Sequence, residues 1–334
     1  MEAATFTASH SRFPRTETGE YPLNIKAQID KEDTRMSDRI KVACIQFACG
    51  EAAASDAEQV KRNIEKAGEL TRQAAAGGAK IVLLSELFER KYFCQERRYD
   101  YYELASHILE NPAVEYFKGL CAELKVVMPI SIYEKDGNEL YNSVVMIDAD
   151  GKLLGVYRKT HIPDDHYYQE KFYFTPGNTG FKVFDTAYGR VGVGICWDQW
   201  FPETARCLAL NGADIILYPT AIGSEPILNV DSSGHWMRTM QGHSAANIIP
   251  VAAANRIGTE SVESSEENGG QRSSLCFYGT SFLTDETGEC IAKASRDREE
   301  IIYADYDFDE IRKNRLSWGL FRDRRPQCYG DITR

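Results

Sequence analysis

The 334-residue sequence contains no uninterrupted apolar run of the roughly 18 residues that a membrane-spanning helix needs. Its N-terminal stretch also lacks the charged start and apolar block of a secretory signal. Basic residues are in the minority, with 39 Lys and Arg against 50 Asp and Glu and a net charge of −11, so no basic stripe is available for nucleic acid or an anionic membrane. We therefore expect a soluble, cytoplasmic protein that binds neither and that favours a cationic small molecule.

Disulfide frameworks and several familiar catalytic motifs are absent as well. The number of cysteines is odd, no C-x-x-C pair occurs, and most cysteines lie in apolar runs, so we expect reduced thiols. The nine are Cys44, Cys49, Cys94, Cys121, Cys196, Cys207, Cys276, Cys290 and Cys328. No G-x-S-x-G elbow, G-x-G-x-x-G fingerprint or P-loop is present, which argues against a serine hydrolase, a dinucleotide enzyme and a nucleoside triphosphatase.

The stretch "HIPDDH" is the best candidate for a metal site. It offers His161, Asp164, Asp165 and His166, but their spacing matches no common zinc pattern. We therefore expect neither a metal nor a cofactor, and a metal held by these four residues is the less favoured alternative.

Two similar halves follow a polar, aperiodic beginning. Residues 1–38 predict a flexible tail, and 39–334 predict the folded domain. Within that domain the order strand, helix, strand, helix, strand, hairpin occurs twice. The predicted helices cover 56–76, 112–124, 202–212 and 235–247. Local sequence recurs too, since "GGAKIVLLSE" is similar to "NGADIILYPT". The Ser-, Glu- and Gly-rich stretch 260–274 predicts a long surface loop.

These elements predict an α/β fold, a four-layer α-β-β-α sandwich of two similar halves. About a dozen strands share about four long helices, too few to cover both faces of one wide sheet. Two sheets must therefore cover each other, with the helices outside. A single doubly wound sheet, which needs a helix in nearly every crossover, is the alternative.

Three reactive side chains each occur in one half only. Cys196 follows the strand "RVGVGI" and precedes a proline-opened helix, where backbone N–H groups favour a thiolate. Glu86 closes "IVLLSE", and Lys159 lies in "GVYRKTHIP". Considered one at a time, Cys196 is typical of a buried structural thiol, Glu86 of a solvated acid and Lys159 of a surface lysine. Together they supply a nucleophile, a base and a cation for an oxyanion.

The segments "LLSELF", "YRKTHIP" and "GICWDQWFPE" resemble, in this order, the three signatures of the nitrilase, or carbon-nitrogen hydrolase, superfamily. The resemblance extends over about residues 39–330 and implies the α-β-β-α fold. It implies Glu86 as general base and acid, Lys159 as support for the oxyanion, and Cys196 as the nucleophile.

The resemblance also implies supporting groups and an assembly. Glu170, in "YYQEKFYFTPG", is the further glutamate expected beyond the lysine, and the backbone N–H of Trp197 is the expected oxyanion donor. Ser85 departs from the proline that many members carry before the glutamate, and we expect little consequence. Members form homo-oligomers built on dimers, so we expect a dimer or a larger assembly.

Residues around the cysteine bear on the substrate. Carbamoyl-amino-acid hydrolases carry an arginine soon after their cysteine for a substrate carboxylate, whereas this chain has "WDQW" over 197–200. Glu225, on the loop after "ADIILYPT", is the expected anchor for a substrate ammonium. Aromatic residues suited to line an apolar channel beside it are His166, Tyr167, Trp200 and Trp236.

The longer strings "HIPDDHYYQEKFYFTPGNTGFKVF", "YPTAIGSEP" and "HWMRTMQGHSAAN" resemble a subfamily of amidases that act on N-carbamoylputrescine. The expected reaction yields putrescine, carbon dioxide and ammonia through a carbamoyl thioester on Cys196, within polyamine synthesis. Two alternatives stay open: an amidase or nitrilase of the same superfamily with another substrate, and a catalytically silent scaffold or thiol sensor on the same fold.

Overall fold

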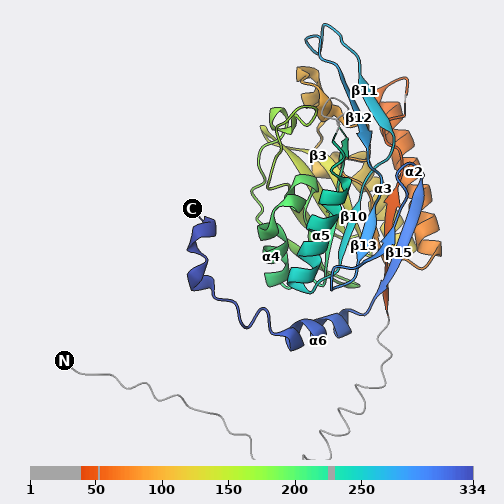
Figure 1. Ribbon diagram of the computed structural model, residues 1–334. Coiled ribbons are helices and arrows are strands. Elements are labelled where there is room, and N and C mark those ends of the chain that lie inside the picture. Colours follow the sequence, from red (N-terminus) through yellow and green to blue (C-terminus); the bar gives the residue numbers. More distant parts are fainter. Residues whose placement is uncertain (1–38, 52, 225–229, 334) are drawn as a thin grey trace, which may run out of the picture. The chain divides into compact units, whose positions relative to one another are not determined.

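Two β-sheets lie at the centre of the fold, with helices beside them (Figure 1). The computed structural model describes residues 39–51, 53–224 and 230–333. The tail predicted over 1–38 lies outside the described residues, and so does Glu225.

The first sheet joins two groups of three strands, β15-β1-β2 and β3-β4-β5. They meet because Ile81 pairs in parallel with Val127, just before β3. The strands are β1 (Ile40–Gln46), β2 (Ile81–Leu83), β3 (Met128–Asp136), β4 (Glu139–Ile147), β5 (Leu153–Arg158) and β15 (Glu300–Tyr306). A strand from the C-terminal end of the chain therefore completes the sheet of the first half.

The second sheet has six strands in the order β14-β13-β10-β8-β7-β6. They are β6 (Val183–Thr186), β7 (Gly189–Val193), β8 (Ile215–Pro219), β10 (Val251–Ala254), β13 (Phe282–Thr284) and β14 (Cys290–Lys293). The pairings between neighbouring strands follow the same order in both sheets. Counted from β15 in the first sheet and from β6 in the second, they are antiparallel, parallel, parallel, antiparallel and antiparallel. The repeat predicted from sequence is thus a repeat of topology.

Three stacked cores produce four layers, because successive residues of a strand face opposite sides of its sheet. In β2, Ile81 and Leu83 join a core between the two sheets, while Val82 faces the core under the first pair of helices. In β8, Leu217 faces the core between the sheets and Tyr218 the core under the second pair. The α-β-β-α sandwich is confirmed, and the single doubly wound sheet is wrong.

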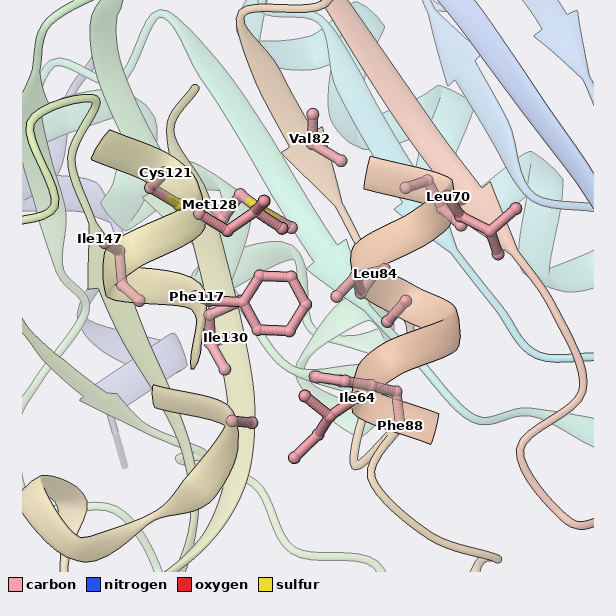
Figure 2. Packing of buried hydrophobic residues seen from close by; sticks show 14 of the residues in the cluster. Ile64, Leu70, Val82, Leu84, Phe88, Phe117, Cys121, Met128, Ile130 and Ile147 are labelled. Atoms are coloured by element: carbon pink, nitrogen blue, oxygen red, sulfur yellow. The ribbon is translucent and has the colours of Figure 1, made fainter. Parts of the chain in front are cut away.

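Helices α2 and α3 cover the first sheet, and α4 and α5 cover the second. Figure 2 shows Phe117 of α3 beside Ile130 of β3, and Ile64 of α2 belongs to the same core. Each buried aliphatic or aromatic side chain of this kind stabilises the fold by about 1.5–3 kcal/mol. Helix α2 begins after Ser55, whose hydroxyl accepts the Glu58 N–H. The helices are α2 (Asp56–Ala76), α3 (Pro112–Leu124), α4 (Pro202–Leu210), α5 (Ser233–Asn247) and α6 (Phe308–Trp318).

Two segments differ from the sequence prediction. The stretch 260–274 is not one loop, because β11 (Thr259–Val262) and β12 (Ser273–Phe277) form an antiparallel pair, and β12 also pairs with β9 (Gly223–Ser224). Exposed and buried residues alternate in β11, but its polar composition gave no alternation of apolar and polar residues in the sequence. One of its buried residues is Glu260, which pairs with Arg256. Helix α6 was not predicted, because it is polar and buries only Phe308 and Ile311.

Short 3₁₀ helices make up most of the remaining regular structure. They are η1 (Phe93–Gln95), η2 (Tyr99–Leu104), η3 (Ile108–Glu110), η4 (Glu170–Phe172), η5 (Cys196–Trp200), η6 (Pro326–Cys328) and η7 (Gly330–Thr333). A search of the described helices found none with the length and apolar character required to cross a bilayer.

Candidate active site

The predicted reactive residues follow the ends of strands from both sheets. Glu86 lies three residues after β2, Lys159 directly follows β5, and Cys196 lies three residues after β7. A backbone hydrogen bond of 3.3 Å from the Glu86 N–H to the Thr220 carbonyl ties the end of β2 to the end of β8. Residues far apart in sequence therefore share one end of the sandwich.

Lys159 lies between two carboxylates. Its Nζ donates to Glu86 Oε1 at 2.8 Å and to Glu170 Oε2 at 2.6 Å, and all three side chains are fully buried. Burial alone would lower the pKa of the Lys159 ammonium, but Glu170 and Glu86 outweigh that effect and hold the pKa well above its usual value. A permanent cation therefore lies inside the site, as oxyanion stabilisation requires.

Glu86 keeps one oxygen available. Its Oε1 accepts from Lys159 and from Asn142 Nδ2, the latter at 2.7 Å, and no hydrogen-bond partner of Oε2 lies among the described residues. The buried guanidinium of Arg256 donates to the backbone carbonyls of Glu86 and Leu87. This support offsets the left-handed backbone of Leu87, whose φ is 47°. Among the described residues, Oε2 is thus the carboxylate oxygen left free to accept a proton.

Glu170 is held by a tyrosine that sequence analysis did not identify. The Tyr92 hydroxyl donates to Glu170 Oε1 at 2.5 Å. Burial raises the pKa of Glu170, although the Lys159 ammonium opposes the rise. Tyr92 lies outside the three motifs, and no local pattern marks it or Asn142, because both reach the site only through the fold.

Cys196 begins η5 in a left-handed conformation, with φ at 41°. Such a conformation costs a non-glycine residue of the order of 1–3 kcal/mol and needs support. Asp198 supplies it, because one carboxylate oxygen accepts the Ile195 N–H at 2.9 Å and the Tyr157 hydroxyl at 2.6 Å. The other accepts from the backbone N–H and the ring Nδ1 of His161. Asp198 therefore joins the cysteine turn to the loop that follows Lys159.

The position of Cys196 in the sequence favours a thiolate, whereas its surroundings in the structure act in the opposite direction. The proline-opened helix α4 begins only at Pro202, so its N-terminal N–H groups are not next to the sulfur. Burial raises the pKa of the Cys196 thiol, Glu86 raises it further, and Lys159 only partly opposes this. These effects favour the protonated sulfur, so a base that accepts the thiol proton assists its attack. Trp197, the second residue of η5, has its N–H in the first turn, where helical N–H groups lack partners within the helix.

Residues predicted to bind substrate fall in several places. His166 and Tyr167 line a cavity of about 420 Å³, which Gln169, the residue before Glu170, also lines, whereas Trp200 packs between Trp197 and His235. Trp236 belongs to α5, is fully buried, and joins the core between this helix and the second sheet. The cavity is lined by Gln95, Arg97, Asp164, Asp165, His166, Tyr167, Gln169, Gln271 and Arg272. Glu225 lies outside the described residues.

The "HIPDDH" stretch is divided in the structure. His161 pairs with Asp198 and stacks on Phe201 with ring centroids 3.7 Å apart, while Asp164, Asp165 and His166 line the cavity. Over residues 39–51, 53–224 and 230–333, no group of three or more His, Cys, Asp or Glu side chains has an arrangement suited to a metal ion.

Comparison with known proteins adds independent information. The family model "Carbon-nitrogen hydrolase" matches residues 41–315. The chain is 51% identical to a citrullinase of Francisella tularensis over 88% of this chain and 98% of the relative. It is 51% identical to the N-carbamoylputrescine amidase of Oryza sativa over 87% and 93%. A carbon-nitrogen hydrolase structure from Helicobacter pylori superposes with a TM-score of 0.78, at 37% identity, over 89% of this chain and 99% of that one.

Proposed function

The chain belongs to the carbon-nitrogen hydrolase family and is a hydrolase of amide carbon–nitrogen bonds, and on this premise we propose that it cleaves N-carbamoylputrescine to putrescine, carbon dioxide and ammonia. Four plant N-carbamoylputrescine amidases, at 48–51% identity over 87% of the chain, support this substrate. The absence of an arginine directly after Cys196 supports a cationic substrate over an acidic one. In this role the enzyme supplies putrescine for polyamine synthesis.

The chemistry begins with the Cys196 thiol. Glu86 Oε2, which has no partner among the described residues, accepts the thiol proton. The thiolate attacks the carbamoyl carbon, and a carbon–sulfur bond forms as the carbonyl oxygen becomes an oxyanion. The Lys159 ammonium and the Trp197 N–H stabilise that charge. The arrangement of Glu86, Lys159 and Glu170 around the sulfur is the observation that carries this mechanism.

Two further steps complete turnover. Glu86 returns its proton to the leaving nitrogen, the carbon–nitrogen bond breaks, and ammonia departs from a carbamoyl thioester. A water molecule, deprotonated by Glu86, attacks the thioester and releases the Cys196 thiol. The product carbamate then loses carbon dioxide to leave putrescine. Glu170 keeps Lys159 charged and in place throughout.

The cavity lined by Asp164, Asp165 and Tyr167 is our proposed site for the distal end of the substrate. The exposed Asp164 and Asp165 offer it carboxylates, and Tyr167 offers an aromatic face. Glu225 stays the choice made from sequence alone. Measuring KM for N-carbamoylputrescine in D165N and in E225Q separates the two, because loss of the anchor raises KM. If neither variant raises KM, both assignments are wrong.

A second substrate is supported by the same cavity. Citrulline has the same ureido chain with a carboxylate beside its ammonium, and the cavity also contains Arg97 and Arg272. Arg97 Nη2 lies 3.9 Å from Asp164 Oδ1, so the cavity has a cation and an anion side by side. The carboxylate and the ammonium of a zwitterion would need both. Under this alternative, R272Q lowers kcat/KM for citrulline and leaves that for N-carbamoylputrescine unchanged.

A substrate panel tests the proposal. Ammonia release is measured with N-carbamoylputrescine, L-citrulline, N-carbamoyl-β-alanine and a simple nitrile, with C196A as the blank. We expect N-carbamoylputrescine to give the highest kcat/KM. Equal values across the panel, or a higher value for another compound, would refute this substrate, and an inactive wild type would favour the silent scaffold. Sedimentation of the full chain tests the expected dimer-based homo-oligomer.

A further inference from the structure

The segment from Glu86 to Tyr92 connects the two sides of the charged site. Glu86 bonds directly to Lys159, and the Tyr92 hydroxyl bonds to Glu170, the other carboxylate on that lysine. Between its two ends the segment consists of turns and irregular backbone. Its buried N–H and carbonyl groups therefore need hydrogen-bond partners from other parts of the chain.

Arg256 supplies those partners at the Glu86 end. Its Nη2 donates to the backbone carbonyls of Glu86 and Leu87 at 2.7 and 2.9 Å, and its Nη1 donates to the carbonyl of Arg90 at 3.1 Å. The guanidinium is fully buried. Because a guanidinium is a rigid planar fork of donors, the three carbonyls that it binds keep fixed positions relative to one another.

Glu260, on β11, binds the Tyr92 end and the guanidinium at the same time. Its Oε2 accepts the Tyr92 backbone N–H, and its Oε1 accepts from Arg256 Nη1 at 3.0 Å. Phe277 packs against both partners, with its ring centroid 5.3 Å from Arg256 Cζ and 6.1 Å from the centroid of the Tyr92 ring. One buried carboxylate thus ties the backbone of Tyr92 to the side chain that holds the backbone of Glu86.

We propose that Arg256 and Glu260 are a positioning pair, which fixes Glu86 relative to Tyr92 and so places both carboxylates on Lys159. The two residues act through backbone groups of the segment, and the chemistry stays with Glu86, Lys159 and Cys196. The proposal rests on the proposed function, in which Glu86 is the base and Glu170 keeps Lys159 in place.

Replacing Glu260 by Gln tests the pair with little change of shape. An amide has one acceptor atom, and both groups that face position 260 are donors, so one of the two bonds is lost. We expect E260Q to lower kcat for N-carbamoylputrescine about 10- to 100-fold, since a misplacement of about 1 Å in a site can cost about 100-fold. KM should stay within about twofold, because other residues line the cavity proposed for the substrate.

Asp214 provides a matched control for a purely structural role. This buried carboxylate has the same kinds of partner, since it accepts from the guanidinium of Arg312 and from the backbone N–H of Arg190. It precedes β8, whereas the reactive residues follow the ends of their strands. We expect D214N to lower the midpoint of urea unfolding, as E260Q does, and to keep kcat within about twofold of the wild type.

A second variant disturbs Glu260 without removing its charge. A Cβ added at Gly50 would lie 2.3 Å from Glu260 Cγ, so G50A must displace the glutamate side chain. A Cβ added at Gly119 would meet no described atom outside its own helix within 4 Å. We therefore expect G50A to lower kcat and G119A to leave it unchanged.

A double variant shows whether Glu260 acts through Tyr92. Y92F removes the donor to Glu170 Oε1 and should lower kcat by itself. If Glu260 holds Tyr92 in place, the loss in E260Q/Y92F is smaller than the product of the two single losses, because both changes disturb one contact. Urea unfolding of the same four proteins gives the same comparison without a substrate.

Three results overturn the proposal: wild-type kcat in E260Q, a loss of kcat in D214N equal to that in E260Q, or independent losses in E260Q and Y92F. If E260Q does not fold, G50A takes its place, and wild-type kcat in G50A rejects the pair. Failure of the proposed function is separate. It shows as ammonia release that survives in C196A, or as a wild type that cleaves no compound of the panel. In that case coupled losses in urea unfolding support the pair and additive losses reject it.

Discussion

Replacing Lys159 by Met removes the one cation between two buried carboxylates. Lys159 bonds to Glu86 at 2.8 Å and to Glu170 at 2.6 Å, with no exposed surface on any of the three side chains. Removing one partner of a buried ion pair usually costs about 3–5 kcal/mol, because the remaining charge is left without compensation. We expect K159M to lower the free energy of unfolding by that amount near neutral pH and to abolish ammonia release.

The loss should depend on pH in a defined direction. Burial raises the pKa of Glu170 in the folded protein, and Lys159 opposes that rise. Without the ammonium, the pKa of folded Glu170 lies further above its value in the unfolded chain. Such a group loses stability as pH rises through its folded-state pKa, and the loss disappears below its unfolded-state pKa. The deficit of K159M should therefore be larger at about pH 8 than at about pH 4.

Urea unfolding of wild type and K159M at both pH values measures the deficit. The exposed Lys152 provides the control, since K152M should change the free energy of unfolding by less than about 0.5 kcal/mol. The double variant K159M/E170Q should recover part of the loss at the higher pH, because one uncompensated charge is gone. A K159M deficit equal at both pH values, or no deficit at all, would show that the buried charge network is not as described.

Three other predictions concern single residues. C196A should lower ammonia release by about 10³-fold or more while C290A, at a half-buried thiol away from the site, keeps wild-type kcat. N142L should lower kcat about tenfold with KM within about twofold, because it removes a donor that orients Glu86; an effect on KM alone would contradict this role. Y92F should lower the free energy of unfolding by about 1–3 kcal/mol, measured by urea unfolding, since Glu170 Oε1 loses its donor; an unchanged midpoint would contradict it.

Local patterns in the sequence were sufficient to predict helices α2 to α5 and the ends of the strands that carry the reactive residues. The period of apolar residues predicted α2 over 56–76, and Pro112 marked the start of α3. Both depend on side chains three or four residues apart, which the chain itself holds at a fixed spacing. The same reasoning missed α6, which buries few side chains, and the strand β11, whose buried residues include a charged one.

The environment of the reactive residues could not be predicted in the same way. Sequence position favoured a thiolate at Cys196, but burial and the neighbouring Glu86 raise the pKa of its thiol. Trp236 was expected to line a channel, and the structure places it on the buried face of α5, where its indole Nε1 donates to Gln199. Both outcomes depend on the depth at which a side chain is buried, and depth is set by layers that come from distant parts of the chain.

The sequence by itself determined the repeat of two α/β halves, the family signatures and the candidate residues Glu86, Lys159 and Cys196, since these are properties of neighbouring residues and of their order. Only the tertiary structure decided that Lys159 bonds Glu86 across 73 positions and that Asn142 orients the same carboxylate. The physical reason is that strand pairing, such as that of β1 with β15, closes long loops. The contacts that result are selected by packing and by burial of charge, neither of which is encoded in local spacing.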